Sequence, residues 1–548
     1  MKNNKPWLAT YGEQIPAEIN PDACRSVVEL LETAMATYAD HPAFRSFGQT
    51  LSYADVDRLS RDFAAYLQRE LGVVKGDRIA VMLPNILAFP IAFIGIARAG
   101  AVQVNVNPLY TPRELEHQLN DSGATIILAF AGVSATVAEV LGRTGVKTVL
   151  VAGPGDGGAA RLPSPPVDAR LTAAIGFADA LAAGAALAFA PVAVNGEDLL
   201  FLQYTGGTTG LSKGAALTHR NLVANVEQFK AFMLAALRPG QEVLVTALPL
   251  YHIFALMVNF ISFFAVGADN WLVANPRDMD GFVDILKQAR PTAFTGVNTL
   301  YAGLTMHPKI GEVDFSRLRL AAGGGAAVIG AVSAKWHEIT GTFIREGYGL
   351  SETSPILSFN PYFIDEFTGT TGLPLPSTDI VLLDDAGNEV APGEAGEICA
   401  KGPQVMRGYW NKPEANAEAF TSDGYFRTGD VGVFDQRGLL KIVDRKKDMI
   451  IVSGFNVYPN EIEAQATTCA GVAECACIGV PDAKSGEAVA LFVVKKPQST
   501  LTVDELATHC RQGMTGYKVP KHIRFVDALP KSAVGKILRR ELRDLPNA

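Results

Sequence analysis

Hydrophobic positions in the first 130 residues follow two patterns, one typical of helices and one typical of buried strands. The two patterns alternate along the chain. Because strands that alternate with helices usually form a parallel sheet covered by helices, we expect an α/β fold. The expected helices are residues 26–38, 52–70 and 88–98, and the expected strands are residues 77–83, 101–106 and 125–130.

Two further segments refine this pattern. Thr111-Pro-Arg-Glu114 has the sequence of a capping box with proline in the first helical turn, so it predicts a short helix that ends near Gly123. Residues 152–195 are rich in alanine, glycine and proline, a composition typical of loops. We expect a surface excursion there and assign no chemistry to it.

The apolar run Leu199–Gln203 predicts a buried strand, and a glycine-rich segment, Tyr204–Gly214, follows it directly. Glycines let backbone N–H groups approach an anion, hydroxyls add donors, and a lysine adds positive charge. The combination suits a polyphosphate, and a flexible surface loop is the alternative. The segment is not a Walker A loop, because in that motif Ser or Thr follows the lysine, whereas Gly214 follows Lys213 here. The candidate phosphate-binding residues are Thr205, Gly206, Gly207, Thr208, Thr209, Gly210 and Lys213.

Length, charge and cysteine content narrow the class of protein. A chain of 548 residues is long enough for at least two domains. The net charge of −8 argues against a general nucleic-acid-binding protein, so we expect no nucleic-acid partner. The six cysteines form no Cys-x-x-Cys pair, which is typical of reduced thiols in a cytoplasmic protein.

The sequence shows no evident membrane-directed segment. Its first ten residues lack the apolar core of a signal peptide. The most apolar run, Ile253–Ala268, is shorter than the roughly 20 residues that a spanning helix needs. We expect a buried helix there, and contact with an acyl chain or a bilayer surface is the alternative.

The glycine-rich segment resembles the phosphate loop of the adenylate-forming enzymes, the superfamily of acyl-CoA synthetases, luciferases and peptide-synthetase adenylation domains. Six further segments resemble motifs of this superfamily and follow its order. The flanking sequence Asn107–Asp121 is most similar to that of bacterial long-chain fatty-acid–CoA ligases. The resemblance covers nearly the whole chain, and the six segments are Leu248–Phe254, Glu346–Thr353, Tyr425–Asp430, Ile442–Asp448, Gly454–Glu463 and Pro530–Lys536.

This resemblance implies a two-part fold. A large N-terminal AMP-binding domain, residues 1–443, would contain parallel sheets covered by helices. A small, mobile α+β domain, residues 448–548, would act as a lid, and residues 444–447 would form the hinge linker. The alternative for residues 444–447, four charges in a row, is a solvated turn.

The resemblance also assigns residues to the nucleotide. Adenine would lie against Gly323–Ala327 with Tyr348 on its face, and Asp430 would accept the ribose hydroxyls. Ser351 would donate to the α-phosphate, and Glu352 would hold Mg²⁺, a hard cation that prefers oxygen ligands. Thr205 is the second residue expected at the metal. The other residues implied to bind nucleotide or CoA are Gly324, Gly325, Ala326, Gly349, Arg445, Lys447 and Gly454.

Two further residues are implied in the chemistry. His252 would flank the carboxylate of the substrate, although a lone histidine among apolar residues is more often a core residue. Lys536 would bridge that carboxylate and the α-phosphate, and Lys531 is the alternative. Gly454 would bring backbone to the pantetheine of CoA.

The implied activity uses ATP, Mg²⁺ and CoA. A long-chain fatty acid would be converted to acyl-AMP with release of pyrophosphate, and the acyl group would then pass to CoA with release of AMP. The alternatives within the superfamily are a CoA ligase for medium-chain or aromatic acids and a peptide-synthetase adenylation domain. A non-catalytic acyl-chain carrier or membrane-bound lipid protein is the alternative outside it.

The C-terminal tail is basic. Gly516–Leu545 has eight basic and three acidic residues, a net charge of +5. This basic segment forms either a solvated face or a surface that binds the phosphates of CoA or an anionic membrane. We expect a cytoplasmic enzyme, with peripheral contact with the inner membrane and a homodimer as open alternatives.

Overall fold

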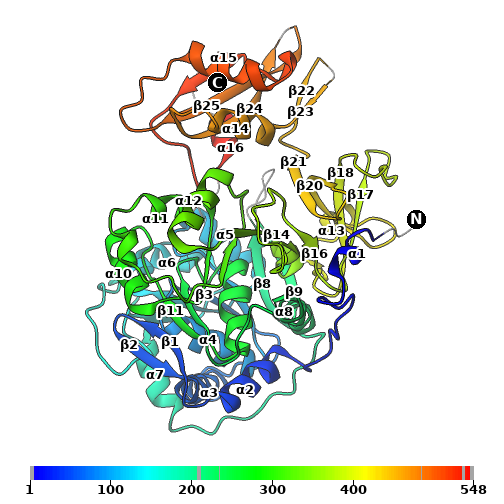
Figure 1. The fold of residues 1–548 in the computed structure, drawn as a ribbon. Helices are drawn as coiled ribbons and strands as arrows, with labels where there is room; N and C mark the ends of the chain where they lie inside the picture. Colours follow the sequence, from blue (N-terminus) through cyan, green and yellow to red (C-terminus); the bar gives the residue numbers. More distant parts are fainter. Residues whose placement is uncertain are drawn as a thin grey trace.

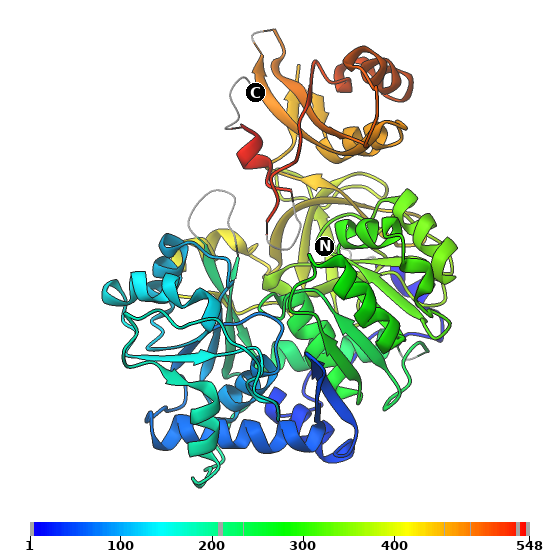
Figure 2. The same cartoon turned by 90° about the vertical axis from the view of Figure 1, so that its left-hand side faces the viewer.

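The computed structural model describes residues 5–205, 212–233, 235–453, 455–482, 484–532 and 537–543. The described strands form four sheets. Two large sheets and a four-stranded sheet make up the larger body, and the fourth sheet belongs to a C-terminal unit that we define as residues 450–543. Figures 1 and 2 show this unit, coloured orange to red, at one end of the larger body.

The first large sheet has eight strands in the order β19-β9-β8-β4-β3-β5-β6-β7. The six strands from β8 to β7 in this order pair in parallel, whereas β9 and β19 are antiparallel additions at one edge. The strands are β3 (Arg78–Met82), β4 (Val102–Asn105), β5 (Ile126–Phe130), β6 (Thr148–Ala152), β7 (Ile175–Gly176), β8 (Leu199–Thr205), β9 (Lys213–Thr218) and β19 (Gly408–Tyr409).

The second large sheet has nine strands in the order β16-β15-β14-β13-β12-β10-β11-β1-β2. Strands β14 to β1 in this order pair in parallel, so their carboxyl ends meet along one edge. The strands are β1 (Pro42–Ser46), β2 (Gln49–Ser52), β10 (Val243–Thr246), β11 (Asp269–Leu272), β12 (Ala293–Gly296), β13 (Leu320–Gly323), β14 (Ile344–Gly349), β15 (Ile356–Phe359) and β16 (Leu373–Pro374).

Helices cover the two sheets, and Figure 2 shows the cyan and green halves of the body side by side above blue helices. The three helices predicted at the start of the chain are present as α2 (Val27–Thr37), α3 (Tyr53–Arg69) and α4 (Ala88–Arg98). The predicted capping box is confirmed, because Thr111 and Glu114 cap α5 (Pro112–Ser122) reciprocally. The other helices of the body are α1 (Trp7–Tyr11), α6 (Ser134–Val140), α8 (His219–Met233), α10 (Met279–Ala289), α11 (Asn298–Met306), α12 (Gly330–Thr340) and α13 (Pro413–Ala419).

The most apolar run of the sequence is buried, as predicted. It forms a π-helix, Ala255–Ser262, that continues into α9 (Phe263–Ala265), and all eight side chains of the π-helix are buried. These residues share one core cluster with α4, every residue of which is also buried. In the part of the chain that the structure describes, no helix has the length and apolar character needed to cross a membrane.

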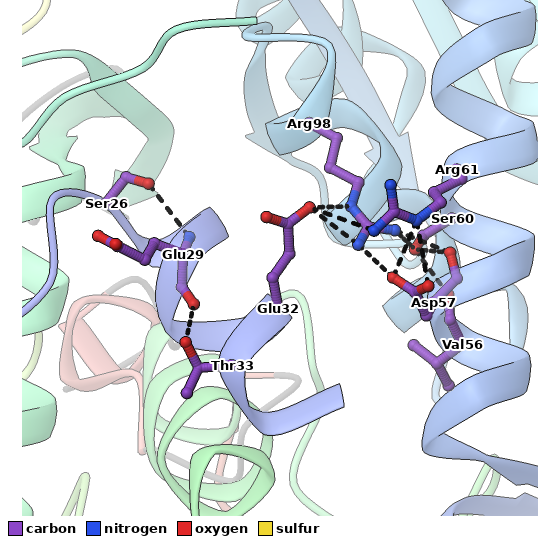
Figure 3. A network of polar contacts seen from close by, with 9 residues as sticks. All are labelled: Ser26, Glu29, Glu32, Thr33, Val56, Asp57, Ser60, Arg61 and Arg98. Atoms are coloured by element: carbon purple, nitrogen blue, oxygen red, sulfur yellow. Dashed lines mark hydrogen bonds and ion pairs between the residues drawn. The ribbon is translucent and has the colours of Figure 1, made fainter. Parts of the chain in front are cut away.

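A buried arginine ties three of these helices together (Figure 3). The Arg98 side chain on α4 is 0% exposed and forms ion pairs with Glu32 of α2 at 3.0 Å and Asp57 of α3 at 2.5 Å. It also donates to the backbone oxygen of Asp57 and to the Ser60 hydroxyl. Its charge is therefore fully compensated inside the fold.

The alanine-rich segment 152–195 is more ordered than its composition predicted. It contains strand β7 and helix α7 (Phe177–Gly184), which packs on α3. Phe177 is buried against Phe63 of α3, with ring centroids 4.9 Å apart. Gly184 lies so close to α3 that a Cβ there would be 2.0 Å from the Asp62 carbonyl oxygen. The prediction of a surface excursion was wrong for this part, because small residues here allow close helix packing.

The four-stranded sheet is antiparallel, and its last strand leads into the C-terminal unit. Its strands are β17 (Asp379–Leu383), β18 (Gly396–Lys401), β20 (Phe426–Phe434) and β21 (Leu440–Arg445). The C-terminal unit is α+β, with its own apolar cluster, as expected. It comprises β22 (Ile450–Val452), β23 (Phe455–Val457), β24 (Val472–Asp482), β25 (Gly486–Lys495) and β26 (His522–Phe525), with helices α14 (Pro459–Thr467), α15 (Val503–Gly513) and α16 (Arg539–Arg543).

Candidate functional site

The candidate site lies at the carboxyl ends of parallel strands, where open α/β sheets generally bind ligands. Strand β8 ends at Thr205, β13 ends at Gly323, and β14 ends at Gly349. A 3₁₀-helix, η5 (Ser351–Thr353), follows β14 directly and contacts both β8 and β9. The two large sheets therefore meet at η5, which carries the predicted residues Ser351 and Glu352.

The two stems of the glycine-rich segment are paired strands. Thr205 at the end of β8 lies opposite Lys213 at the start of β9. His117 of α5 hydrogen-bonds the Ser212 carbonyl oxygen at 2.9 Å, and Tyr204 donates to Asp121 of α5 at 2.8 Å. Helix α5 thus anchors both stems. The predicted phosphate-binding residues between them, Gly206, Gly207, Thr208, Thr209 and Gly210, lie outside the described residues.

Lys213 and Glu352 come together through a tyrosine that the sequence analysis did not single out. The Lys213 ammonium lies over the ring of Tyr409, 4.5 Å from its centroid. The Tyr409 hydroxyl donates to Glu352 Oε1 at 2.8 Å. Tyr409 lies on β19, which pairs with β9 at the edge of the eight-stranded sheet.

Glu352 is a buried carboxylate that forms no ion pair with any residue that the structure describes. Glu352 is 7% exposed. Burial raises the pKa of its carboxyl despite the hydrogen bond from Tyr409 and the nearby charge of Arg445. A carboxylate in this setting favours any added positive charge. Within the described ranges no group of three or more His, Cys, Asp or Glu could hold a metal. Mg²⁺ needs no such group when phosphates and water supply most ligands, so Glu352 fits it.

The predicted ribose site is a second polar cluster. Asp430 on β20 lies directly opposite Arg445 on β21, and the two form an ion pair at 3.2 Å. The Tyr348 hydroxyl donates to the other Asp430 oxygen at 2.7 Å. Since a carboxylate oxygen can accept more than one hydrogen bond, Asp430 keeps acceptor capacity for two hydroxyls.

The predicted adenine turn packs tightly against β14. A Cβ on Gly324 would lie 3.3 Å from the Gly347 carbonyl oxygen, and Gly325 has φ +77, a conformation that favours glycine. Ala326 follows as an exposed residue. Glu346 of β14 accepts from the Val328 backbone N–H at 3.0 Å and so fixes the end of this turn.

His252 lies on a loop that two buried amides hold from the other sheet. Asn85 donates to the carbonyl oxygens of Thr246 and Leu248, and accepts from the Leu250 N–H. Gln203 of β8 donates to the Tyr251 carbonyl oxygen at 3.2 Å. The loop that precedes the π-helix is therefore fixed, and His252 is half-buried at its end.

The four residues of the predicted hinge linker, 444–447, lie in two different structural elements. Asp444 and Arg445 lie inside strand β21, and Lys446 and Lys447 lie in the turn after it. Asp444 is 0% exposed and accepts from the Asn460 N–H of α14 at 2.8 Å.

Two C-terminal residues of the prediction, Gly454 and Lys536, lie outside the described residues. Lys531, the alternative to Lys536, forms an ion pair with Glu474 of β24 at 2.6 Å.

Sequence reasoning missed Tyr409. It also missed the ion pair between Asp121 and Lys412, at 2.5 Å, which lies beside Tyr204. The capping box predicted the helix that carries Asp121 but not where its carboxylate lies. Strand β19 has two residues, too few for any periodicity. The only hint was Gly408-Tyr409-Trp410, an aromatic pair after glycine, which is not specific.

Comparison with known proteins agrees with this geometry. The AMP-binding enzyme family matches residues 31–410, and the AMP-binding enzyme C-terminal domain matches residues 461–536. Curated proteins named long-chain-fatty-acid–CoA ligase include one from Salmonella typhimurium, 52% identical over 98% of both chains, and one from Haemophilus influenzae, 47% identical over 98% of both.

The fold is also that of a solved ligase. The anthranilate CoA ligase AuaEII in complex with anthranoyl-AMP has a TM-score of 0.85 and 25% identity, with 96% of this chain and 98% of that chain covered. The whole length of the chain is therefore accounted for by one architecture. The chain belongs to the AMP-binding enzyme family, the adenylate-forming enzymes that its motifs resemble.

Proposed function

We propose that this protein is a long-chain-fatty-acid–CoA ligase that works through acyl-AMP. The observation that carries the proposal is near-full-length similarity, at 47–52% identity, to curated ligases of that name. The polar groups expected for the reaction support it, because Tyr409 contacts both Lys213 and Glu352, and Tyr348 of β14, the strand before η5, contacts Asp430.

In the first half-reaction, a fatty carboxylate oxygen bonds to the α-phosphorus of ATP, and the bond from this phosphorus to the pyrophosphate oxygen breaks. The reactants are both anions, so positioning and charge compensation are the main demands. Lys213 and the glycine-rich segment would bind the phosphates, Ser351 would donate to the α-phosphate, and Asp430 would hold the ribose. Lys536 would bridge the carboxylate and the α-phosphate.

Glu352, with Thr205 nearby, would hold Mg²⁺ on the phosphates. When bound, the ion supplies charge neutralisation and orients the leaving pyrophosphate. The buried Glu352 carboxyl, whose pKa is raised by burial, supports this role, because a cation beside it would favour its ionised form.

In the second half-reaction the thiolate of CoA attacks the acyl carbonyl carbon, and the bond to the AMP oxygen breaks. We propose that the C-terminal unit rotates between the two halves and presents Gly454 to pantetheine in the second. The boundaries 1–443, 444–447 and 448–548 stay predictions. Because Asp444 and Arg445 lie within β21, we propose that the hinge motion uses Lys446 and Lys447, the two linker residues in the turn after this strand.

The test combines purified protein, ATP, Mg²⁺ and oleate, with pyrophosphate release and acyl-AMP as readouts. We expect both products without CoA and oleoyl-CoA with it; no AMP-linked acyl product would overturn the proposal. Lys536→Ala should abolish adenylate formation and spare thioester formation from supplied oleoyl-AMP. Equal loss in both half-reactions would remove the proposed role of Lys536.

Aromatic and medium-chain acids are the second candidate substrates. The likeness to an anthranilate CoA ligase favours them only at the level of the fold, with 25% identity against 52% for the fatty-acid relative. A rate profile over acids of increasing chain length and benzoate separates the two. A maximum at benzoate or at medium-chain acids would reject the long-chain assignment.

Cytoplasmic location, peripheral membrane contact and a homodimer stay predictions. The basic tail supports membrane contact less than its charge suggested, because five of its described basic side chains pair with carboxylates, four of them in the C-terminal unit and the fifth, Asp448, just before it. These basic side chains are Lys518, Lys521, Lys531, Arg539 and Arg543. Flotation with anionic vesicles tests the contact, and light scattering tests the dimer.

A further inference from the structure

We propose that Tyr409 is a positioning residue that separates Lys213 from Glu352 and holds each where the phosphates and their cation are bound. The inference rests on the proposed function, and it concerns a residue outside every segment that the resemblance identified. Tyr409 touches both groups with different parts of one side chain.

The ring of Tyr409 supports the lysine. The Lys213 ammonium lies 4.5 Å from the ring centroid, within the range of a cation–π interaction. Among the described residues, Lys213 has no carboxylate within ion-pair distance, and the adjoining residues 206–211 include no Asp or Glu. The lysine therefore rests on a neutral surface and keeps its full charge for an incoming anion.

The hydroxyl of Tyr409 supports the carboxylate. It donates to Glu352 Oε1 at 2.8 Å, and the Glu352 backbone is fixed in turn by the Met406 N–H, which donates to its carbonyl oxygen at 2.7 Å. A phenol is a neutral donor, so it orients the carboxylate without neutralising it. A lysine or arginine in this place would form a salt bridge and compete with a cation for Glu352.

The backbone of Tyr409 is held on both sides. Residues 408 and 409 pair with Ala216 and Ala215 of β9, and the Trp410 N–H donates to the Gly214 carbonyl oxygen at 2.8 Å. Asn416 of α13 accepts from the Tyr409 N–H at 2.6 Å and donates to its carbonyl oxygen at 3.0 Å. The side chain thus extends from a rigid two-residue strand, as a positioning group requires.

Two substitutions separate the two contacts. Tyr409→Phe keeps the ring under Lys213 and removes the hydrogen bond to Glu352. Tyr409→Leu removes both. Tyr425→Phe is the matched control, because the Tyr425 hydroxyl also donates to a carboxylate, Asp379, at 3.3 Å, and Lys401 lies over its ring at 5.7 Å, but on the four-stranded sheet.

The first readout is equilibrium binding of α,β-methylene-ATP with and without Mg²⁺. For Tyr409→Phe we expect unchanged metal-free binding and an about fivefold smaller gain in affinity on adding Mg²⁺. For Tyr409→Leu we expect metal-free binding to weaken as well, by about fivefold, because the lysine loses its support. Tyr425→Phe should match the wild type in both conditions.

The second readout is pyrophosphate release with oleate. Tyr409→Phe should lower kcat about tenfold and raise the KM for ATP up to about fivefold, in line with its smaller gain in affinity from Mg²⁺, whereas Tyr409→Leu should raise the KM further. In a double-mutant cycle, Tyr409→Phe should have little further effect on Glu352→Gln, since it acts through that carboxylate. Thermal unfolding of each variant checks that it is folded.

The outcomes distinguish this inference from the proposed function. If the wild type forms no acyl-AMP, the proposed function fails, whatever the variants do. If the wild type is active and Tyr409→Phe matches it in binding and kcat, the positioning role of Tyr409 is wrong. Additive effects of Tyr409→Phe and Glu352→Gln would also overturn it.

Discussion

Arg98 and Glu352 are both buried charged residues, yet their surroundings differ. Arg98 has two carboxylates, a carbonyl and a hydroxyl around its guanidinium (Figure 3). Among the described residues, the Glu352 carboxylate accepts from the neutral Tyr409 hydroxyl and forms no ion pair. The first arrangement is complete in the free protein. The second leaves a buried carboxylate without a described cationic partner, which agrees with the proposed site for a metal–nucleotide complex.

The pKa directions agree with this contrast. Arg98 and Arg61 together outweigh burial and lower the pKa of the Asp57 carboxyl. Burial dominates at Glu352 and raises its pKa. Glu346 is an intermediate case, since its only described donor is the Val328 N–H and burial raises its pKa to about 8. Charge compensation, more than burial alone, therefore separates structural from functional groups here.

The largest effect that the comparison predicts is on catalysis. Glu352→Gln keeps the size and the hydrogen bond from Tyr409 but removes the charge. We expect acyl-AMP formation to fall by about 100-fold or more, as for other electrostatic groups of active sites. Stability should stay equal or rise, because a buried, uncompensated carboxylate is lost. Pyrophosphate release and urea unfolding measure the two effects, and a large loss of stability would contradict the comparison.

The next effect is on stability. Arg98→Met should lower the free energy of unfolding by about 1–3 kcal/mol, because it removes two ion pairs and two further hydrogen bonds, although Arg61 still pairs with both carboxylates. The carboxylates of Glu32 and Asp57 are 39% and 33% exposed, so water limits the cost. Measured well below its unfolding temperature, the variant should keep wild-type kcat. A loss of kcat without loss of stability would show that the network serves catalysis.

A smaller effect concerns pH. The folded pKa of Glu346, about 8, lies above its ordinary value, so the folded protein binds this proton more tightly than the unfolded chain. Stability should therefore fall as the pH rises toward 8, by up to about 1.4 kcal/mol per pH unit from this group. Glu346→Gln should flatten the dependence in urea unfolding between pH 6 and 9. An unchanged slope would show that Glu346 is ionised at neutral pH.

The smallest effect is expected at an exposed, compensated charge. Lys531 is ion-paired with Glu474 and both side chains are about a third exposed or less, at 31% and 28%. Lys531→Met should change stability by less than about 1 kcal/mol, as for most surface ion pairs. Adenylate formation should stay within about twofold of the wild type. A large loss of adenylation would transfer the proposed role from Lys536 to Lys531.

Local signals made much of the fold predictable. The Thr111 and Glu114 cap lies within four residues, and the early strands and helices show their period in one short window. Helix α7 was missed because alanine and glycine give little amphipathic contrast. Its packing on α3 also depends on contacts between residues more than 100 positions apart, such as that of Phe177 in α7 with Phe63 in α3.

Single motifs led to Glu352 and Asp430, and the structure places both among polar partners, with Tyr409 at Glu352 and with Arg445 and Tyr348 at Asp430. The candidate site was not predictable where contacts cross the chain. Tyr409 reaches Lys213 through strand pairing between distant segments, and Asp121 meets Lys412 across 291 positions. The start of the expected hinge lies in β21 because Asp444 and Arg445 pair with β20, and no local pattern indicates that Asp444 also contacts α14.

Strand β21 has a consequence for communication between the two parts of the molecule. Its last residue, Arg445, touches the expected ribose carboxylate, and the residue before it, Asp444, caps the first helix of the C-terminal unit. The expected ribose site and the contact of β21 with α14 therefore lie at adjacent peptide units. Because one residue inserted between Asp444 and Arg445 would shift the register of the strand and reverse its faces, it should disrupt one of these two contacts.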